Sequence, residues 1–424
     1  MAAEPVTCPE GLASIAVVLP VVHRATVRAV VPLGGGVAPG AGLPRPEAVV
    51  RGWEAQRRVG LQAQVPDPAL QAALDVARLQ LLVGPEKDAP AEEGAVLVGA
   101  LSRLGRHREA GDLVRALWSR QRTDGSFDEP AGGATAGGPH LWALGEHLRT
   151  SRDTQLAAEL SPGIVAAEGW LRELEAGGRL AEPARRWAEE GRLAAAAAAR
   201  PAGAEGAARV LVEGSRAVPD DTAGKASPDP AAAAVLRLHG AGDARRGHPA
   251  VVGPAGFDVT ATLAAAAADL LERTPGALER LTWLLQAGGP TWSWPDHLHP
   301  RTGAGSAGSG ASRVALAGFL LLVRDLLVTE SEPGAADIVP VLPDAWRGQP
   351  LEVGETVLAG GTRLSFAVRW HGTRPALLWE VTGPLRLTAR GLDPTFVTVE
   401  RRGEALLAEA VSTSPADDGT VELS

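Results

Sequence analysis

The sequence predicts a mainly α-helical protein in which an array of helical hairpins is flanked by antiparallel β segments at both ends. Apolar residues recur at helical spacing from Pro68 to Val328, whereas β-branched residues alternate near the two ends of the chain. A chain of 424 residues also exceeds the usual size of a single hydrophobic core. We therefore expect a partial β unit in residues 1–48, a helical domain in residues 49–330 and a β domain in residues 331–424.

Charge and composition limit the classes of partner and compartment. The formal net charge of -9, without a clustered basic stripe, argues against nucleic acid or an anionic membrane as partner. Cys8 is the single cysteine, so no internal disulfide can form, and the lack of Asn removes N-glycosylation sites. The apolar run of residues 314–328 is broken by Arg324 and is too short to span a bilayer. We expect a soluble, cytoplasmic protein with an uncharged or small ligand, and the sequence leaves the oligomeric state open.

The first 46 residues combine a strand pattern with a turn. Residues 14–33 are rich in β-branched side chains, and residues 34–46 form a predicted Gly/Pro-rich turn. The strand segment is too short for a complete β-sandwich.

The central region divides into predicted helices of one to two dozen residues, separated by short Gly, Pro or Asp linkers. Asp67 is the predicted N-cap of the first helix, and Pro68 occupies its first position. The predicted helices span residues 68–82, 93–104, 108–120, 139–148, 154–174, 183–199, 230–238, 260–271, 275–286 and 312–328. Such short connections favour antiparallel helical hairpins over β-α-β units. Residues 203–230 lack an apolar period and are predicted to form a long loop.

The last region has a strand pattern. Leu364, Phe366, Val368 and Trp370 alternate with polar residues and so share one face of a predicted strand. Further predicted strands cover residues 376–381, 384–388 and 395–400. This spacing is typical of a small antiparallel β domain.

A loop over residues 291–305 concentrates aromatic and charged side chains between two apolar helical runs. Ring faces together with hydrogen-bonding groups on a helical scaffold favour a sugar-binding loop. The candidate residues are Trp292, Trp294, Asp296, His297, His299 and Arg301. Alternatively, the two tryptophans plug a helix end and the polar groups only satisfy backbone.

Other motifs give weaker signals. His297 and His299 lack further ligands at metal-binding spacing, so no metal site is expected. Residues 303–308 match G-x-G-x-x-G, but neither a preceding strand nor a β-α-β unit is predicted, so we interpret them as a flexible glycine loop. No cofactor is expected.

The order of these segments resembles the bacterial six-hairpin glycosidase-like proteins, which are related to glycogen-debranching and trehalase-like hydrolases. The resemblance covers most of residues 49–370. The matching segments are Val49-Val-Arg-Gly-Trp-Glu54, Leu70-Gln-Ala-Ala-Leu74, Gln121-Arg-Thr-Asp-Gly-Ser-Phe127, Leu141-Trp-Ala-Leu-Gly-Glu-His147, Trp294-Pro-Asp296, His299-Pro-Arg-Thr-Gly303 and Ile338-Val-Pro-Val-Leu-Pro-Asp-Ala-Trp346.

This resemblance implies an (α/α)6 toroid, complete or incomplete in this chain, that hydrolyses or binds an α-linked oligosaccharide or other glycoside in its mouth. Hydrolysis would use two carboxylic groups, one to protonate the leaving oxygen and one to activate water or attack carbon. Trp142, with Trp292 or Trp294, would stack on sugar rings. His297, His299 and Arg301 would bind hydroxyls.

Three acidic positions carry open alternatives. Asp296 is the first candidate for a catalytic acid, although it equally suits a turn cap or a pair with Arg301. Glu129, beside Asp128, is the second candidate, and its alternative is a solvated turn. Glu146 either points inward with Trp142 or pairs with Arg149 on a wet face, and we favour the wet face. Trp142 is expected in the interior.

The chain departs from the family pattern where acids and rings normally cluster. Residues 131–138, 185–199 and 308–314 are dominated by Gly, Ala, Ser and Arg. The alternative hypothesis is therefore a catalytically inactive homologue that serves as a sugar-binding or protein-interaction scaffold.

Overall fold

The computed structural model describes residues 44–83, 89–129, 134–135, 137–180, 184–216, 250–252, 256–308, 310–332 and 334–409. The chain divides into two compact units, Met1–Gly52 and Trp53–Ser424. The predicted N-terminal strands, the turn of residues 34–46 except its last three residues, and the predicted helix of residues 230–238 lie outside the described residues. The three-domain division of the sequence stays a prediction.

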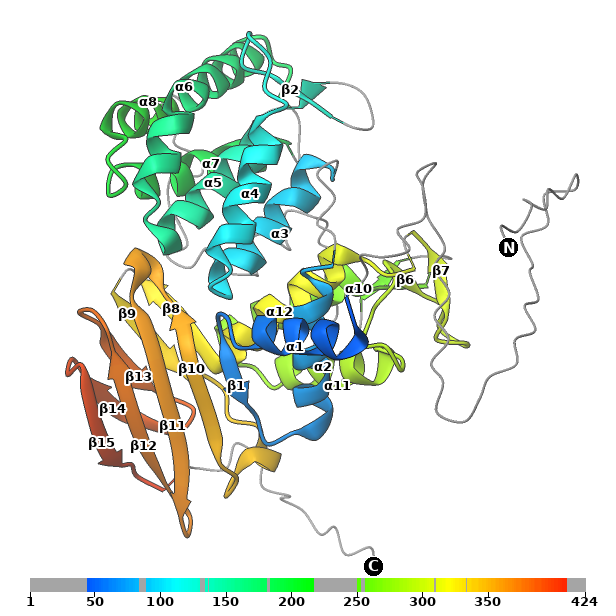
Figure 1. Cartoon of the computed structure of the whole chain (residues 1–424), viewed down its shortest axis with the longest axis vertical. Helices are drawn as coiled ribbons and strands as arrows, with labels where there is room; N and C mark the ends of the chain where they lie inside the picture. The colour runs from blue at the N-terminus through cyan, green and yellow to red at the C-terminus, as the bar shows by residue number, and fades with distance from the viewer. Residues whose placement is uncertain are drawn as a thin grey trace, which may run out of the picture. The chain divides into compact units, whose positions relative to one another are not determined.

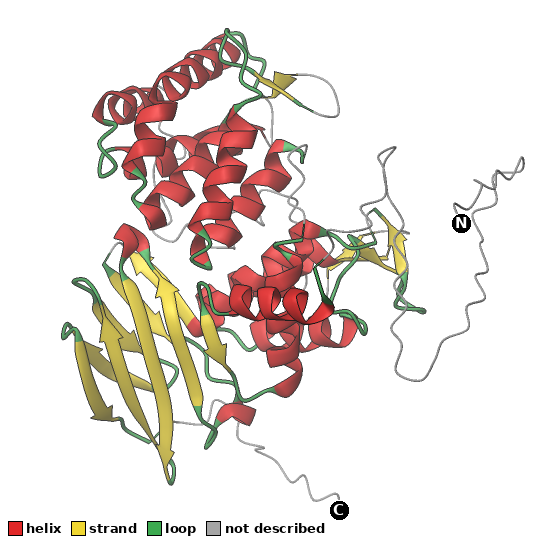
Figure 2. Cartoon of the chain, in the orientation of Figure 1, coloured by secondary structure: helices red, strands yellow, loops and turns green. Residues whose placement is uncertain are grey.

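Helices form most of the described chain before residue 328, and strands form most of it afterwards (Figures 1 and 2). The described helices are α1 (Pro46–Arg57), α2 (Pro68–Gln80), α3 (Ala91–Arg103), α4 (His107–Trp118), α5 (Gly138–Ser151), α6 (Thr154–Ala176), α7 (Ala184–Ala199), α8 (Glu205–Arg216), α10 (Val259–Glu272), α11 (Gly276–Ala287) and α12 (Arg313–Leu327). Mixed helix and antiparallel sheet is thus the observed class.

The predicted cap Asp67 is confirmed, and Ser312 is a further cap. The Asp67 carboxylate accepts hydrogen bonds from the first turn of α2, and Ser312 accepts one from Ala315 in α12. Two helices were missed. Pro46 begins α1 within the predicted Gly/Pro turn, and α8 occupies part of the predicted loop of residues 203–230. Ala207, Ala208 and Leu211 are buried on one face of α8, so the expectation that this segment lacks an apolar period is wrong for its first part.

The strands form four sheets. They are β1 (Gln62–Gln64), β2 (Phe127–Asp128), β3 (Ala134–Thr135), β4 (Ala250–Val252), β5 (Gly256–Asp258), β6 (His297–Leu298), β7 (Gly305–Ala307), β8 (Val328–Glu332), β9 (Ala335–Ile338), β10 (Leu351–Val357), β11 (Arg363–His371), β12 (Arg374–Val381), β13 (Arg386–Ala389), β14 (Asp393–Thr398) and β15 (Arg402–Leu406). The sheet orders are β1-β10-β11-β12-β15, β14-β13-β9-β8, β2-β3 and β4-β5-β6-β7.

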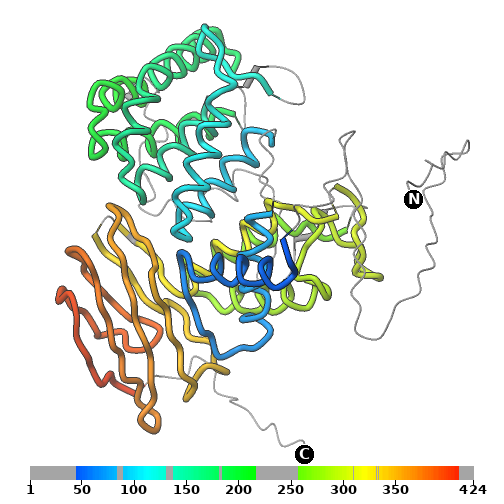
Figure 3. The backbone as a smooth tube through the Cα atoms, in the orientation of Figure 1, coloured from blue at the N-terminus to red at the C-terminus, as the bar shows by residue number. Residues whose placement is uncertain are grey.

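The five-stranded sheet and the four-stranded sheet β14-β13-β9-β8 make the predicted C-terminal β region, in which most pairs are antiparallel and β9 pairs parallel with β13. Leu364, Phe366 and Val368 of β11 are buried, as their alternation predicted, and Trp379 of β12 meets Phe396 of β14 edge to face at 5.5 Å. The short β1 pairs antiparallel with β10, so a segment near the first helices completes the C-terminal sheet (Figure 3). Sequence periodicity does not report this pairing.

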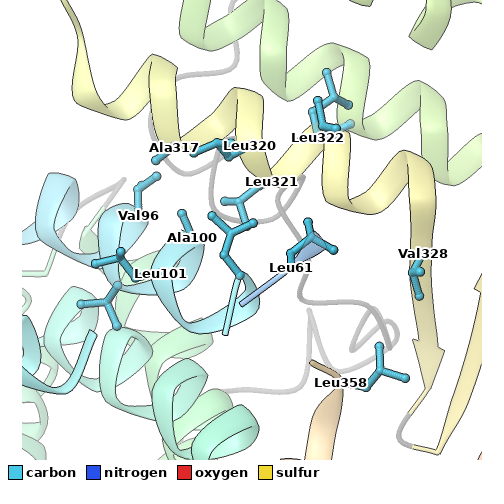
Figure 4. Close-up of a cluster of buried hydrophobic side chains, with 14 of the residues drawn as sticks. Leu61, Val96, Ala100, Leu101, Ala317, Leu320, Leu321, Leu322, Val328 and Leu358 are labelled. Carbon is cyan, nitrogen blue, oxygen red and sulfur yellow. The ribbon is translucent and has the colours of Figure 1, made fainter. Parts of the chain in front are cut away.

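Five helices pack in a row in the order α10, α12, α3, α5, α7. In Figure 4, Val96 and Ala100 of α3 lie beside Ala317, Leu320 and Leu321 of α12. These side chains are buried and belong to one continuous core. Residues 217–249, between α8 and α10, lie outside the described part of the chain.

Buried ion pairs show that α3, α5 and α12 run in the same direction. Arg103 of α3 contacts Glu146 of α5 at 3.0 Å. Arg149, in the last turn of α5, contacts Glu330 of β8 at 3.1 Å, and Arg324 of α12 contacts the same carboxylate at 3.0 Å. Because all these residues lie in the C-terminal halves of their helices, the three C-terminal ends meet.

Small residues let α5 and α7 approach backbone to backbone. A Cβ on Gly138 would meet Trp187 and Ala188, and a Cβ on Gly145 would meet Ala194 and Ala195. Seven residues along α5 therefore correspond to seven along α7, which makes the two helices parallel. The N-terminal ends of α5 and α7 lie at the same level.

Candidate functional site

The loop between α11 and α12 lies at the N-terminal ends of α10 and α12. The Val259 N–H donates to the Asp296 carbonyl at 3.1 Å, and the Ser312 N–H donates to the Trp294 carbonyl at 2.6 Å. Strands β5, β6 and β7 pair beside these helix starts. The predicted glycine loop of residues 303–308 is therefore partly a strand, because β7 completes the ladder.

The two tryptophans of this loop take different positions. Trp294 is 1% exposed, donates from Nε1 to the Leu284 carbonyl at 2.8 Å and packs on Phe319 with ring centroids 4.6 Å apart. Trp294 therefore fills the end of a helix, as the alternative interpretation of the loop predicted. It would have to leave the core to stack on a sugar. Trp292 is half-buried and has a left-handed backbone with φ 49°, which is uncommon for a residue other than Gly.

Asp296 is half-buried, and its carboxylate packs against the backbone of Gly308. A Cβ at residue 308 would collide with this carboxylate, and Gly308 also has φ 72°. Gly308 thus gives Asp296 its place in the loop.

Three basic side chains follow Asp296 along the loop. Nε2 of His297 lies 3.8 Å from Oδ2 of Asp258, and both side chains are about one quarter exposed, at 25% and 22%. Nδ1 of the exposed His299 accepts hydrogen bonds from the Arg301 and Thr302 N–H groups at 3.2 and 3.3 Å. Arg301 is exposed. His299 therefore shapes the turn, while the guanidinium of Arg301 faces solvent.

Glu129 serves a structural role at another helix start. Its Oε2 accepts a hydrogen bond from the Ala91 N–H at 3.1 Å, at the first residue of α3. A carboxylate there is stabilised by the helix dipole. Asp128 forms an ion pair with Arg122 at the surface, as the solvated-turn alternative proposed.

Of the two predictions made for side chains of α5, the one for Trp142 is confirmed and the one for Glu146 is wrong. Trp142 is 1% exposed, as its predicted interior position requires, and it meets Trp187 edge to face at 6.2 Å. Glu146 does pair with Arg149, at 3.1 Å, but it is also 1% exposed, so the wet-face prediction is wrong. The reason is distant in sequence: Arg103 supplies a second guanidinium that compensates the buried charge. These two arginines hold the pKa of Glu146 low although burial opposes that shift.

One acidic side chain was missed by the sequence reasoning. Glu190 of α7 is half-buried, and burial, followed by the charge of Glu189, raises its pKa. Within the described part of the chain its carboxyl has neither an ion pair nor a hydrogen bond. The neighbouring acids Glu189 and Glu190 are the feature of the sequence that could have pointed to this site.

The orientation of Glu190 follows from its neighbours. Arg192, two residues later, binds Glu168 and Glu175 of α6 at 2.7 and 2.6 Å. Residues two apart on an α-helix point about 200° apart, so Glu190 points away from α6. Because Gly191 packs against the first residue of α5, Glu190 lies level with the N-terminal end of that helix.

Other classes of site receive no support from the described ranges. In them, no three His, Cys, Asp or Glu side chains are placed to hold a metal ion. No helix among them combines the length and apolarity needed to cross a bilayer. No protein-family model and no curated protein matches the chain.

Proposed function

We propose that the chain is a glycoside-hydrolase-like protein that acts on α-linked oligosaccharides at the N-terminal ends of its parallel helices. The proposal combines the resemblance to six-hairpin glycosidases with an (α/α)6 toroid, and the row of helices from α10 to α7 would supply part of the inner ring of that toroid. The observation that carries it is Glu190, a half-buried and unpaired carboxyl whose pKa is raised. Such a group is suited to general acid catalysis.

Glu190 is the proposed proton donor to the leaving oxygen, in place of Glu129. Asp296 is the second carboxylate, and Trp292, His297, His299 and Arg301 are the sugar-binding side chains. Both carboxylates belong to segments at the N-terminal ends of parallel helices. In a hydrolase, their separation would determine whether the anomeric configuration is retained or inverted.

A sugar-binding protein without turnover is the second candidate. Three acids of the loop before α5 have structural roles: Glu129 bonds the start of α3, Asp128 pairs with Arg122, and Asp124 accepts from Ser126 at 2.9 Å. If Glu190 has no carboxylate partner across the mouth, the site can bind a glycan but not cleave it.

The test is turnover of malto-oligosaccharides and aryl α-glucosides by the full chain, with binding followed in parallel by calorimetry. We expect Glu190→Gln to lose about 100-fold or more in kcat, because it cannot donate a proton. Glu173→Gln is the matched control, since Glu173 is an exposed glutamate of α6. We expect it to retain turnover within about twofold.

The outcomes separate the candidates. Turnover that survives Glu190→Gln removes Glu190 from the mechanism. Binding without turnover by the unmodified chain supports the non-hydrolytic protein. Neither binding nor turnover across the panel contradicts both.

A further inference from the structure

Asp258 and His297 face each other across the β5–β6 ladder. Their Cα atoms are register partners, and Nε2 of His297 lies 3.8 Å from Oδ2 of Asp258. This separation is too long for a direct hydrogen bond, so the carboxylate of Asp258 acts on the imidazole through space. Both side chains keep about a quarter of their surface exposed, at 25% and 22%. A ligand can therefore reach the pair.

The two oxygens of Asp258 have different surroundings. Oδ1 accepts a hydrogen bond from the Ala261 N–H at 2.8 Å and so caps α10. The helix N-terminus favours the anionic carboxylate. Oδ2 is left to face His297. The capping hydrogen bond thus fixes the orientation of the Asp258 carboxylate, with Oδ2 toward His297.

The surroundings of His297 favour one ring tautomer. A carboxylate beside Nε2 favours a proton on that nitrogen. Nδ1 is buried and has no hydrogen-bond partner in the described structure. The other strand paired with β6 is β7, Gly305–Ala307, which carries no titratable side chain. Asp258 is therefore the charged neighbour that orients the imidazole from the paired strands.

We infer that Asp258 is a positioning residue for His297 and that the pair recognises a sugar hydroxyl. A hydroxyl group both accepts and donates, so it can accept from Nε2–H of His297 and donate to Oδ2 of Asp258. Asp296 precedes His297 in the chain, and its carbonyl accepts a hydrogen bond from the Val259 N–H at 3.1 Å, which fixes the backbone before His297. The inference rests on the proposed glycan function of the same loop.

The variant Asp258→Asn separates this role from the helix cap. Asn is as good an N-cap as Asp, so α10 keeps its first-turn hydrogen bond. With its oxygen in that bond, the amide nitrogen takes the place of Oδ2 and presents a donor to Nε2. We expect the neutral ring of His297 to move its proton from Nε2 to Nδ1.

The tautomer is read from long-range ¹H–¹⁵N spectra of the full chain labelled at histidine, with the His297 signals assigned by their loss in His297→Gln. Maltotetraose affinity is measured by calorimetry, and we expect Asp258→Asn to weaken it about tenfold. Asp67→Asn is the matched control. Asp67 caps α2 in the same way, accepting from the Ala69 N–H at 2.8 Å, and we expect it to change neither readout.

The two readouts distinguish failure of the inference from failure of the proposed function. An unchanged His297 tautomer in Asp258→Asn overturns the positioning role, whether or not the glycan binds. A changed tautomer with unchanged maltotetraose affinity overturns the recognition of a hydroxyl by the pair. A changed tautomer in a chain that binds no oligosaccharide supports the positioning role and contradicts the glycan function.

Discussion

Two buried histidines should make the protein sensitive to mild acid. His140 is 0% exposed, stacks on Phe127 with centroids 3.7 Å apart, and has no hydrogen-bond partner in the described structure for either ring nitrogen. Burial, and to a smaller extent Arg120, lowers its pKa from 6.5 to about 3. Burial, and then His107, lowers the pKa of His147 to about 4. Both rings are neutral in the native protein at pH 5.

The direction of the pH effect follows from these pKa values. Between pH 6.5 and 4 the unfolded chain binds protons at both positions, whereas the native protein binds few. The free energy of unfolding is therefore highest above pH 6.5 and falls as the pH decreases. At pH 5 each histidine contributes a loss of about 2 kcal/mol, or about 4 kcal/mol for the pair. That is a large part of an ordinary net stability of about 5–15 kcal/mol.

The assay is guanidinium-induced unfolding of the full chain at pH 8 and pH 5, followed by tryptophan fluorescence. The variant His140→Phe has a ring that can keep the stack on Phe127. We expect it to show about half the loss in the free energy of unfolding between pH 8 and pH 5 that the unmodified chain shows. His371→Gln is the control because His371 is exposed at the end of β11. Equal stability at pH 8 and pH 5, or a full pH effect in His140→Phe, would refute the assigned cause.

Three further changes test the packing and the structural acids. Gly191→Ala should lower the free energy of unfolding, measured in urea, by about 2 kcal/mol or more, because a Cβ would collide with the Gly138 carbonyl. The control Gly169→Ala should raise it slightly, because a Cβ there meets nothing within 4 Å. Glu330→Gln should cost about 3–5 kcal/mol by the same measurement, since it leaves buried arginines without their carboxylate. Glu129→Ala should lower the free energy of unfolding by about 1 kcal/mol and leave any turnover of the folded protein unchanged. A loss of turnover in the folded variant would return Glu129 to the mechanism.

Local signals in the sequence predicted most of the described helices and only part of the sheets. Asp67 and Ser312 are caps with side-chain hydrogen bonds, so their helices were predicted with nearly correct starts. The three residues of β1 were missed because their partner, β10, lies almost 300 residues later, and pairing at that distance leaves no periodicity. Helix α8 was missed although Ala207, Ala208 and Leu211 are buried at helical spacing, because the segment that follows it is rich in Gly, Pro and Asp and the whole stretch was assigned to a loop.

The sequence predicted the location of the candidate loop, but it did not predict what each of its side chains does. Residue type drew attention to Trp294 and Glu129, yet the structure uses one as a core residue and the other as a partner of a helix start. Conversely, Asp258 looked like an ordinary cap, and the register of β5 with β6 brings it opposite His297. Roles of this kind depend on contacts between elements that are distant in sequence.

The two ends of the parallel helices differ in how completely their polar side chains are paired. At the C-terminal ends, Arg149 and Arg324 share the Glu330 carboxylate, and these two arginines hold its pKa near 2 although burial opposes that shift. At the N-terminal ends, Glu190 and Nδ1 of His297 lack such partners among the described residues. Unsatisfied polar groups cost stability, and a fold tolerates them where other contacts compensate. Glu330→Gln should therefore change stability far more than oligosaccharide binding, whereas Glu190→Gln should leave stability equal or higher while it removes turnover.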